Sequence, residues 1–109
     1  MKNRPQPTQS SEILLGNVYV MTHSFFSDVI RIGCTTQDPE TYAKTLSEKI
    51  PGKYTLVFSL QCDNPCKVKS QIQTYLKAEE YINEFYQVTT DVAERLLKRE
   101  SLRIPMFNS

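Results

Sequence analysis

Two short segments near the start of the chain constrain its fold more than any other feature. They cover residues 16–21 and 29–33, and both are rich in β-branched and aromatic residues. This composition is typical of β-strands. The apolar residues 13–15 lead into the first segment, and residues 23–27 separate the two. We therefore expect an antiparallel hairpin closed by a longer loop at residues 23–27.

A capping residue followed by proline occurs twice and predicts two helix starts. Asp38 precedes Pro39, and Asn64 precedes Pro65. A side chain of this kind accepts hydrogen bonds from the free N–H groups of the first turn, and proline suits the first helical position. Apolar residues then recur at helical spacing in both segments. We expect the first helix to end at residues 51–52 and the second near residues 81–83. Thr89 caps a third predicted helix.

The remaining pattern predicts a single α/β domain. Apolar and polar residues alternate through residues 54–62, which indicates a third strand, and residues 84–88 are expected to form a short strand or extended segment. We expect a small, mainly antiparallel sheet of three or four strands flanked by three helices. The chain has 109 residues, which is enough for one core. The predicted domain covers residues 13–103, between flexible tails at residues 1–12 and 104–109.

The charge balance limits how the chain can bind nucleic acid. Lys and Arg number 13 against 12 Asp and Glu, giving a net charge of +1. A protein that binds nucleic acid chiefly through charge is usually more basic, so any binding must come from a local patch. The third predicted helix carries such a patch, although cations also suit a helix C-terminus for structural reasons. Its members are Arg95, Lys98, Arg99 and Arg103.

The cysteine content and the apolar runs favour a reduced compartment. The three cysteines, Cys34, Cys62 and Cys66, are an odd and sparse set, which predicts reduced thiols. Cys62 and Cys66 lack the further ligands that structural zinc requires. No run approaches the roughly 20 apolar residues that span a membrane, and the N-terminus has no apolar signal core. We expect a cytoplasmic or other reduced intracellular location, without secretion and without a membrane partner.

Several of these segments together resemble the GIY-YIG nucleases, most closely the phage-type branch. Residues 17–19 and 31–33 resemble the two short strands that give this superfamily its name. Residues 35–40 resemble the entry to the helix that follows, and residues 84–88 resemble a terminal segment with a glutamate followed by aromatic residues. The order and spacing match over residues 16–97. The resemblance implies a metal-dependent endonuclease that hydrolyses a DNA phosphodiester with one divalent ion, Mg²⁺ or Mn²⁺.

The resemblance also implies roles for three residues, and a fourth is a candidate beside them. Tyr19 falls on a tyrosine that helps to activate water, and Glu84 on the glutamate that holds the metal. Gly33 falls on a glycine that lets a phosphate approach the backbone, because it has no side chain. Arg31 on the second strand is a further candidate, from its own charge, for contacting a phosphate. Each also has a structural alternative: Tyr19 as an ordinary strand aromatic, Glu84 as a solvated carboxylate, and Arg31 on the solvent face.

The departures from the family pattern favour a fold that no longer cleaves. Tyr42 stands where the first helix should carry an arginine, and Leu46 where a histidine can follow one turn later. Gln73 replaces a histidine expected on the second helix. The single histidine, His23, lies away from these positions. We therefore expect a degenerate nuclease domain that binds DNA weakly, or a protein partner, with little or no cleavage. The alternative is an active endonuclease that uses Tyr19 and Glu84.

Two geometric expectations follow from this reading. Tyr19, Arg31, Gly33 and Glu84 should converge on one face of the sheet, with Tyr42 and Leu46 beside them. Arginine should be absent from the first-helix side of that site, unless Lys44 or Lys49 projects inward instead. Phe25 and Phe26, in the predicted loop, form either an exposed binding surface or a hydrophobic cover, and the sequence does not decide between these alternatives.

Overall fold

The computed structural model describes residues 15–82 and 84–103 and confirms the predicted α/β class. Five strands form one sheet in the order β3-β1-β2-β5-β4, and every neighbouring pair is antiparallel. The predicted tails at residues 1–12 and 104–109 lie outside the described residues. The elements are β1 (Leu15–His23), β2 (Phe26–Thr35), α1 (Pro39–Lys49), β3 (Tyr54–Asp63), α2 (Pro65–Tyr75), a 3₁₀ turn (Lys77–Glu79), β4 (Glu80–Ile82), β5 (Phe85–Tyr86) and α3 (Thr90–Arg103).

The sheet has five strands rather than the three or four predicted. The two residues of β5 lie within the short strand or extended segment predicted at residues 84–88. The additional strand is β4, whose three residues are too few for an alternating pattern to reveal it. The predicted second helix also ends earlier than expected, at Tyr75 rather than near residues 81–83. The chain leaves the helix through the 3₁₀ turn so that β4 can pair with β5 at the sheet edge.

The β1–β2 hairpin is tighter than predicted. Both strands extend into the segment expected to be a loop, and only residues 24–25 form the turn. His23 pairs with Phe26 across the hairpin. The ring of His23 is buried against those of Phe26 and Tyr54, with ring centroids 5.2 and 4.7 Å away. This aromatic packing accounts for the additional strand residues.

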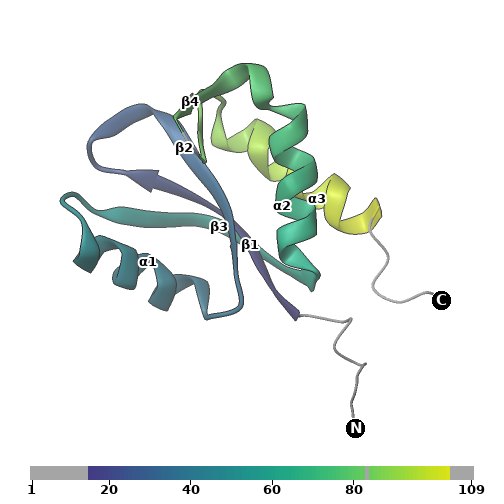
Figure 1. Ribbon diagram of the computed structural model, residues 1–109, viewed down its shortest axis with the longest axis horizontal. Helices are drawn as coiled ribbons and strands as arrows, with labels where there is room; N and C mark the ends of the chain where they lie inside the picture. The colour runs from purple at the N-terminus through teal and green to yellow at the C-terminus, as the bar shows by residue number, and fades with distance from the viewer. Residues whose placement is uncertain (1–14, 83, 104–109) are drawn as a thin grey trace, which may run out of the picture.

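The sheet is covered on both faces, as Figure 1 shows, with α1 on one side and α2 and α3 on the other. Alternation along β1 divides its side chains between two cores. Val18 and Val20 pack with residues from α2 and α3, such as Ile72 and Leu97. Tyr19 and Met21 pack on the opposite face, in a second core that includes Ala43 of α1 and Phe85 of β5. Among the described residues, no helix is long and apolar enough to cross a membrane.

Two of the three predicted helix caps are confirmed. Asp38 Oδ2 accepts a hydrogen bond from Thr41 N at 3.0 Å, and Thr89 Oγ1 accepts one from Val92 N at 3.2 Å. Asn64 does not cap α2 through its side chain, which corrects the third expectation. Its backbone adopts a left-handed conformation with φ of 54°, and its carbonyl oxygen begins the helical hydrogen bonds instead.

A disulfide between Cys34 and Cys66 corrects the expectation of reduced thiols. It joins β2 to the first turn of α2, with the two Cα atoms 5.3 Å apart in space and the two cysteines 32 positions apart in sequence. Cys62 is buried as a free thiol. Nothing in the spacing of the cysteines indicates this pair, because the packing of α2 on β2 brings them together. Disulfides persist in non-reducing environments, so the cysteine-based reason for expecting a reduced compartment no longer holds.

We predict that removing this disulfide lowers the free energy of unfolding substantially. A cross-link that closes a loop of this length restricts the unfolded chain and contributes roughly 3.7 kcal/mol. The double variant Cys34→Ser, Cys66→Ser should therefore unfold at a lower urea concentration than the oxidised wild type. Adding dithiothreitol should lower the urea midpoint of the wild type to that of the variant and leave the midpoint of the variant unchanged. A wild-type midpoint that does not respond to reductant would contradict the prediction.

Candidate functional site

The candidate site is built around Arg31, whose guanidinium reaches partners on three other parts of the sheet. Arg31 Nε donates a hydrogen bond to Tyr19 Oη at 3.2 Å, and Nη1 donates one to Tyr54 Oη at 3.3 Å. Nη2 forms an ion pair with Glu84 Oε1 at 2.9 Å. The cation also lies 5.4 Å from the centre of the Tyr54 ring. The arginine side chain is 18% exposed, so these partners replace most of its water.

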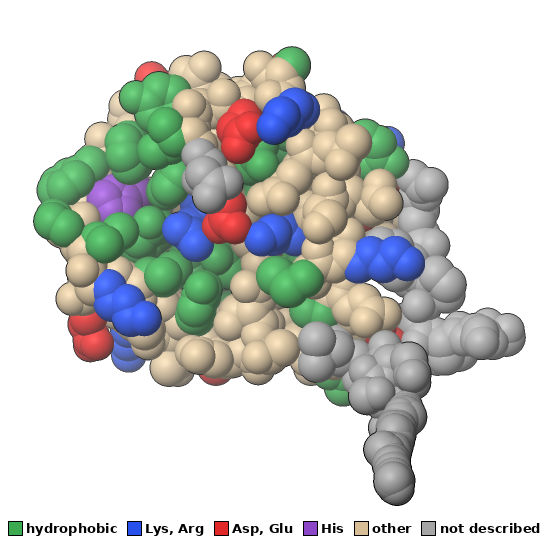
Figure 2. Space-filling model, viewed as in Figure 1, with side chains coloured by type: hydrophobic (Ala, Val, Ile, Leu, Met, Phe, Trp, Pro, Cys, Tyr) green, Lys and Arg blue, Asp and Glu red, His purple; other side chains and the backbone are tan. Residues whose placement is uncertain are grey.

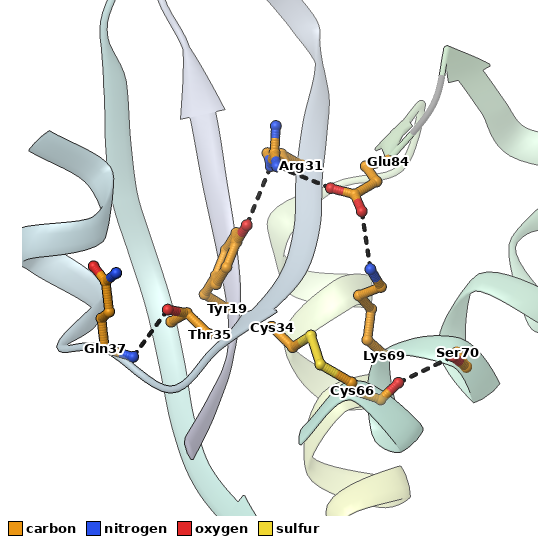
Figure 3. The surroundings of a disulfide bond; sticks show 9 residues. All are labelled: Tyr19, Arg31, Cys34, Thr35, Gln37, Cys66, Lys69, Ser70 and Glu84. Atoms are coloured by element: carbon orange, nitrogen blue, oxygen red, sulfur yellow. Dashed lines mark hydrogen bonds and ion pairs between the residues drawn. A yellow bond between two sulfur atoms is a disulfide. The ribbon is translucent and has the colours of Figure 1, made fainter. Parts of the chain in front are cut away.

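Glu84 is held by two cations rather than one. Its second oxygen, Oε2, lies 2.9 Å from Lys69 Nζ on α2, while Oε1 contacts Arg31. Figure 3 shows the three side chains in a row, with Glu84 between the cations. Glu84 precedes β5 with a positive φ of 71°. Its carbonyl oxygen accepts a hydrogen bond from Ile32 N at 3.1 Å, which fixes this turn against β2.

Gly33 makes room for Tyr19. The two residues are partners in the β1–β2 register. A Cβ atom at Gly33 would come within 2.2 Å of Tyr19 Oη and 2.5 Å of Cζ. The phenol of Tyr19, which is 1% exposed, therefore fills the space beside this glycine. In the structure, the missing side chain of Gly33 leaves room for the ring of Tyr19, whereas the resemblance implied that it leaves room for a phosphate.

The environment of Tyr19 keeps its hydroxyl protonated. Burial raises the pKa of Tyr19 to about 12, while the charge and the hydrogen bond of Arg31 act in the opposite direction. Burial on its own would lower the pKa of Arg31, but Tyr19 and Glu84 raise it above its usual value. At neutral pH the pair is therefore a neutral phenol that accepts a hydrogen bond from a permanently charged guanidinium.

The expected convergence on one face is confirmed, and so is the position of the first-helix residues. Tyr19 and Glu84 both contact Arg31, and Gly33 lies against Tyr19. On α1, Tyr42 places its ring centroid 5.8 Å from that of Tyr19, and Leu46 packs against the same core. No arginine or lysine of α1 reaches the Glu84 carboxylate in the described part of the chain.

Sequence reasoning missed Lys69 and Tyr54. Lys69 supplies the cation that α1 lacks, but it lies 15 residues from Glu84 in sequence, and no spacing rule links the two. Tyr54 reaches this face because of an irregularity in the pairing of β1 with β3. Val20 pairs with Phe58 while Met21 pairs with Leu56, so one extra residue in β3 shifts its side chains between the two cores. A simple alternation would not reveal that shift.

The basic residues of α3 are not part of this site. Ala93 and Leu97 anchor α3 in the core on the opposite face of the sheet. Arg95 pairs with Asp91 at 2.9 Å and Lys98 with Glu94 at 3.1 Å, each one helical turn away. Arg99 Nε lies 3.5 Å from the buried Glu100. The predicted phosphate-binding residues Arg95, Lys98 and Arg99 are thus separated from Arg31 by the sheet, and their charges are paired locally.

Glu84 does not fit the role of a metal ligand in this arrangement. Both of its oxygens are occupied by cations, and a divalent ion placed beside them would be repelled by Arg31 and Lys69. Mg²⁺ also needs several oxygen ligands around it. Within residues 15–82 and 84–103, no group of three His, Cys, Asp or Glu side chains is arranged to hold a metal ion.

Comparisons with protein-family models, with curated proteins and with solved structures found no match for this chain. The resemblance to the GIY-YIG nucleases therefore rests on the residues and their order alone. It stays a prediction, and so do the roles that it implies for Tyr19, Gly33 and Glu84 and the phosphate contact expected of Arg31.

We predict that Tyr19 titrates near pH 12. The difference in tyrosinate absorbance between the wild type and Tyr19→Phe should show this midpoint, because burial opposes the charged phenolate. The raised pKa also sets the direction of the stability change. The ordinary pKa of a tyrosine is 10. The contribution of the protonated Tyr19 phenol to the free energy of unfolding is therefore complete below pH 10 and is lost as the pH rises from 10 towards 12. A difference titration centred near pH 10 would contradict this account.

Proposed function

We propose that this domain binds the phosphates of DNA at Arg31 and Lys69 and does not cleave them. The observation that supports this most directly is the position of the Glu84 carboxylate, held at 2.9 Å by both cations. Carboxylate and phosphate oxygens make the same charge-assisted hydrogen bonds with guanidinium and ammonium groups. A phosphate that displaced Glu84 would therefore find two donors already arranged around an anion.

The same geometry argues against hydrolysis. Hydrolysis needs a group that takes a proton from water near neutral pH. Tyr19 is a poor base, because its pKa of about 12 keeps it protonated and Arg31 already donates to its oxygen. Generating hydroxide on a metal ion is the usual alternative, but Lys69 stands at the carboxylate that would hold the ion. The site offers contacts for an anion without a route to activate water.

DNA binding at this site should be weak and moderately sensitive to salt. Two cations and one carboxylate leave the cluster with a small positive charge, and the whole chain carries only +1. Affinity for phosphate gains from the release of counterions in proportion to the phosphates neutralised. About two phosphates contacted would give a slope near −2 when the logarithm of affinity is plotted against that of salt.

An active endonuclease remains the second candidate because one observation favours it. Tyr19 and Glu84, which the resemblance implies for catalysis, both contact Arg31. For this candidate to hold, Lys69 would have to leave Glu84 and a metal ion would have to replace it. The two candidates predict opposite effects of changing Glu84, and this difference makes them separable.

We predict that Glu84→Gln strengthens DNA binding while Lys69→Gln weakens it. Glutamine removes the carboxylate that competes with phosphate, and a partly exposed ion pair is worth up to about 1 kcal/mol, or about fivefold in affinity. Lys69→Gln should lower affinity by at least a similar factor and reduce the salt slope by about 1. Fluorescence anisotropy with labelled DNA measures both effects. Lys49→Gln, with the same charge change at an exposed position of α1, serves as the control.

We also predict that the protein leaves supercoiled plasmid intact in Mg²⁺ or Mn²⁺, because the site lacks a base and a free metal ligand. A nicking assay in parallel with Glu84→Gln measures this directly. Cleavage by the wild type that disappears in Glu84→Gln would establish the endonuclease and reject the binding-only function. Cleavage that persists in the variant would instead indicate a contaminating nuclease, and purification to constant activity would remove it.

A further inference from the structure

Two aromatic rings lie exposed beside the candidate site. Phe25, in the turn between β1 and β2, is 66% exposed, and Tyr81 on β4 is 54% exposed. Together with Phe26 they line an open hollow of about 220 Å³, whose other lining residues include Asp28 and Gln87. Figure 2 shows hydrophobic side chains gathered on this side of the molecule, next to the charged side chains of the site. We call Phe25, Phe26 and Tyr81 the aromatic edge.

Ring contacts connect the aromatic edge to Arg31. The Tyr81 ring centroid lies 6.1 Å from that of Phe26, which lies 5.2 Å from that of Phe85. The Arg31 guanidinium carbon is 6.0 Å from the Phe85 centroid. Phe26 and Phe85 belong to the core on the α1 face, the same face that carries Arg31. Arg31 and the aromatic edge therefore share one face of the sheet, and Lys69 reaches the same carboxylate, Glu84, from α2.

A surface of this kind suits a polymer that carries both anionic groups and flat rings. Proteins that bind single-stranded nucleic acid combine cations along the backbone path with aromatic side chains on which bases stack. In a duplex the faces of the bases are covered by their neighbours, so rings such as Phe25 and Tyr81 would find no surface to stack on. Unpaired bases present those faces and can reach the hollow.

The polar residues of the hollow favour a base over an apolar protein segment. An apolar side chain placed there would cover Asp28 and Gln87 and leave their polar groups without water or a partner, which is unfavourable. The edge of a base offers N–H groups and acceptors that a carboxylate and an amide can pair with. The cations nearby add attraction for the phosphates that a base necessarily brings with it.

We propose that this surface binds single-stranded DNA, with phosphates at Arg31 and Lys69 and bases stacked on Phe25 and Tyr81. This inference rests on the proposed function, because it takes the phosphate site as given and adds the form of the DNA. The hollow between the aromatic edge and Gln87 receives one base, and the neighbouring phosphates extend over Glu84 towards Lys69.

The test compares labelled oligonucleotides that differ only in their bases or their pairing. Fluorescence anisotropy would measure the affinity of the oxidised, full-length protein for an oligothymidylate, for an abasic strand with the same number of phosphates, for a duplex and for an oligouridylate. Phe25→Ala and Tyr81→Ala remove the exposed rings. Tyr75→Ala, which removes a partly exposed ring on α2 near Arg99, is the matched control, and circular dichroism with thermal unfolding verifies that each variant is folded.

We expect the oligothymidylate to bind more tightly than the abasic strand or the duplex. Each ring variant should lower affinity for the oligothymidylate about tenfold and leave affinity for the abasic strand unchanged, whereas Tyr75→Ala should change neither. Lys69→Gln should weaken binding to both strands. Equal affinity for the thymidylate and abasic strands, or a preference for duplex, would overturn the inference while leaving phosphate binding intact. Tighter binding of oligouridylate would overturn the assignment to DNA, and a failure of all the strands to bind would refute the proposed function itself.

Discussion

The arrangement of this domain depends on a cation placed on a mostly apolar face of its sheet. A charge that is taken out of water is costly unless it is paired and hydrogen-bonded. Arg31 meets this requirement with three side chains, Tyr19, Tyr54 and Glu84. They come from β1, from β3 and from the turn before β5, so one guanidinium links four parts of the sheet. Removing any one partner would leave a donor of the guanidinium unpaired in a site that water reaches poorly.

The position of Glu84 shows that this pairing overrides local backbone preference. A residue other than glycine at φ of 71° adopts a conformation that costs on the order of 1 kcal/mol. The hydrogen bond from Ile32 N and the two ion pairs hold it there. The Cys34–Cys66 disulfide contributes from the other side. It fixes the first turn of α2 to β2, and Lys69 follows Cys66 by one helical turn, so the ammonium is held near the carboxylate.

The sequence predicted those features of the structure that depend on residues close together in the chain. Alternation placed Arg31 opposite Ile30 and Ile32, and the caps at Asp38 and Thr89 form because their side chains act on N–H groups three residues away. The resemblance placed Tyr19 and Glu84 near Arg31.

What the sequence did not predict depends on contacts between distant segments. Lys69 meets Glu84, and Cys34 meets Cys66, only once α2 packs against β2. Tyr54 faces the site because an irregularity in β3 shifts its alternation. Such an irregularity lies in the pairing of two strands, so neither strand's sequence carries a signal for it.

The tethered carboxylate gives a physical reason why the proposed phosphate site would depend on the aromatic edge. Glu84 is part of the chain, so it competes with any anion at a high effective concentration, on the order of millimolar or above. A single phosphate in solution would displace it poorly. A strand that also stacks bases on Phe25 and Tyr81 would bring its phosphate to Arg31 and Lys69 as a tethered group. The effective concentration of the phosphate would then be comparable to that of the Glu84 carboxylate. The proposed binding of an unpaired strand therefore requires both the cations and the exposed rings, because the stacked bases hold the phosphate close enough to compete with Glu84.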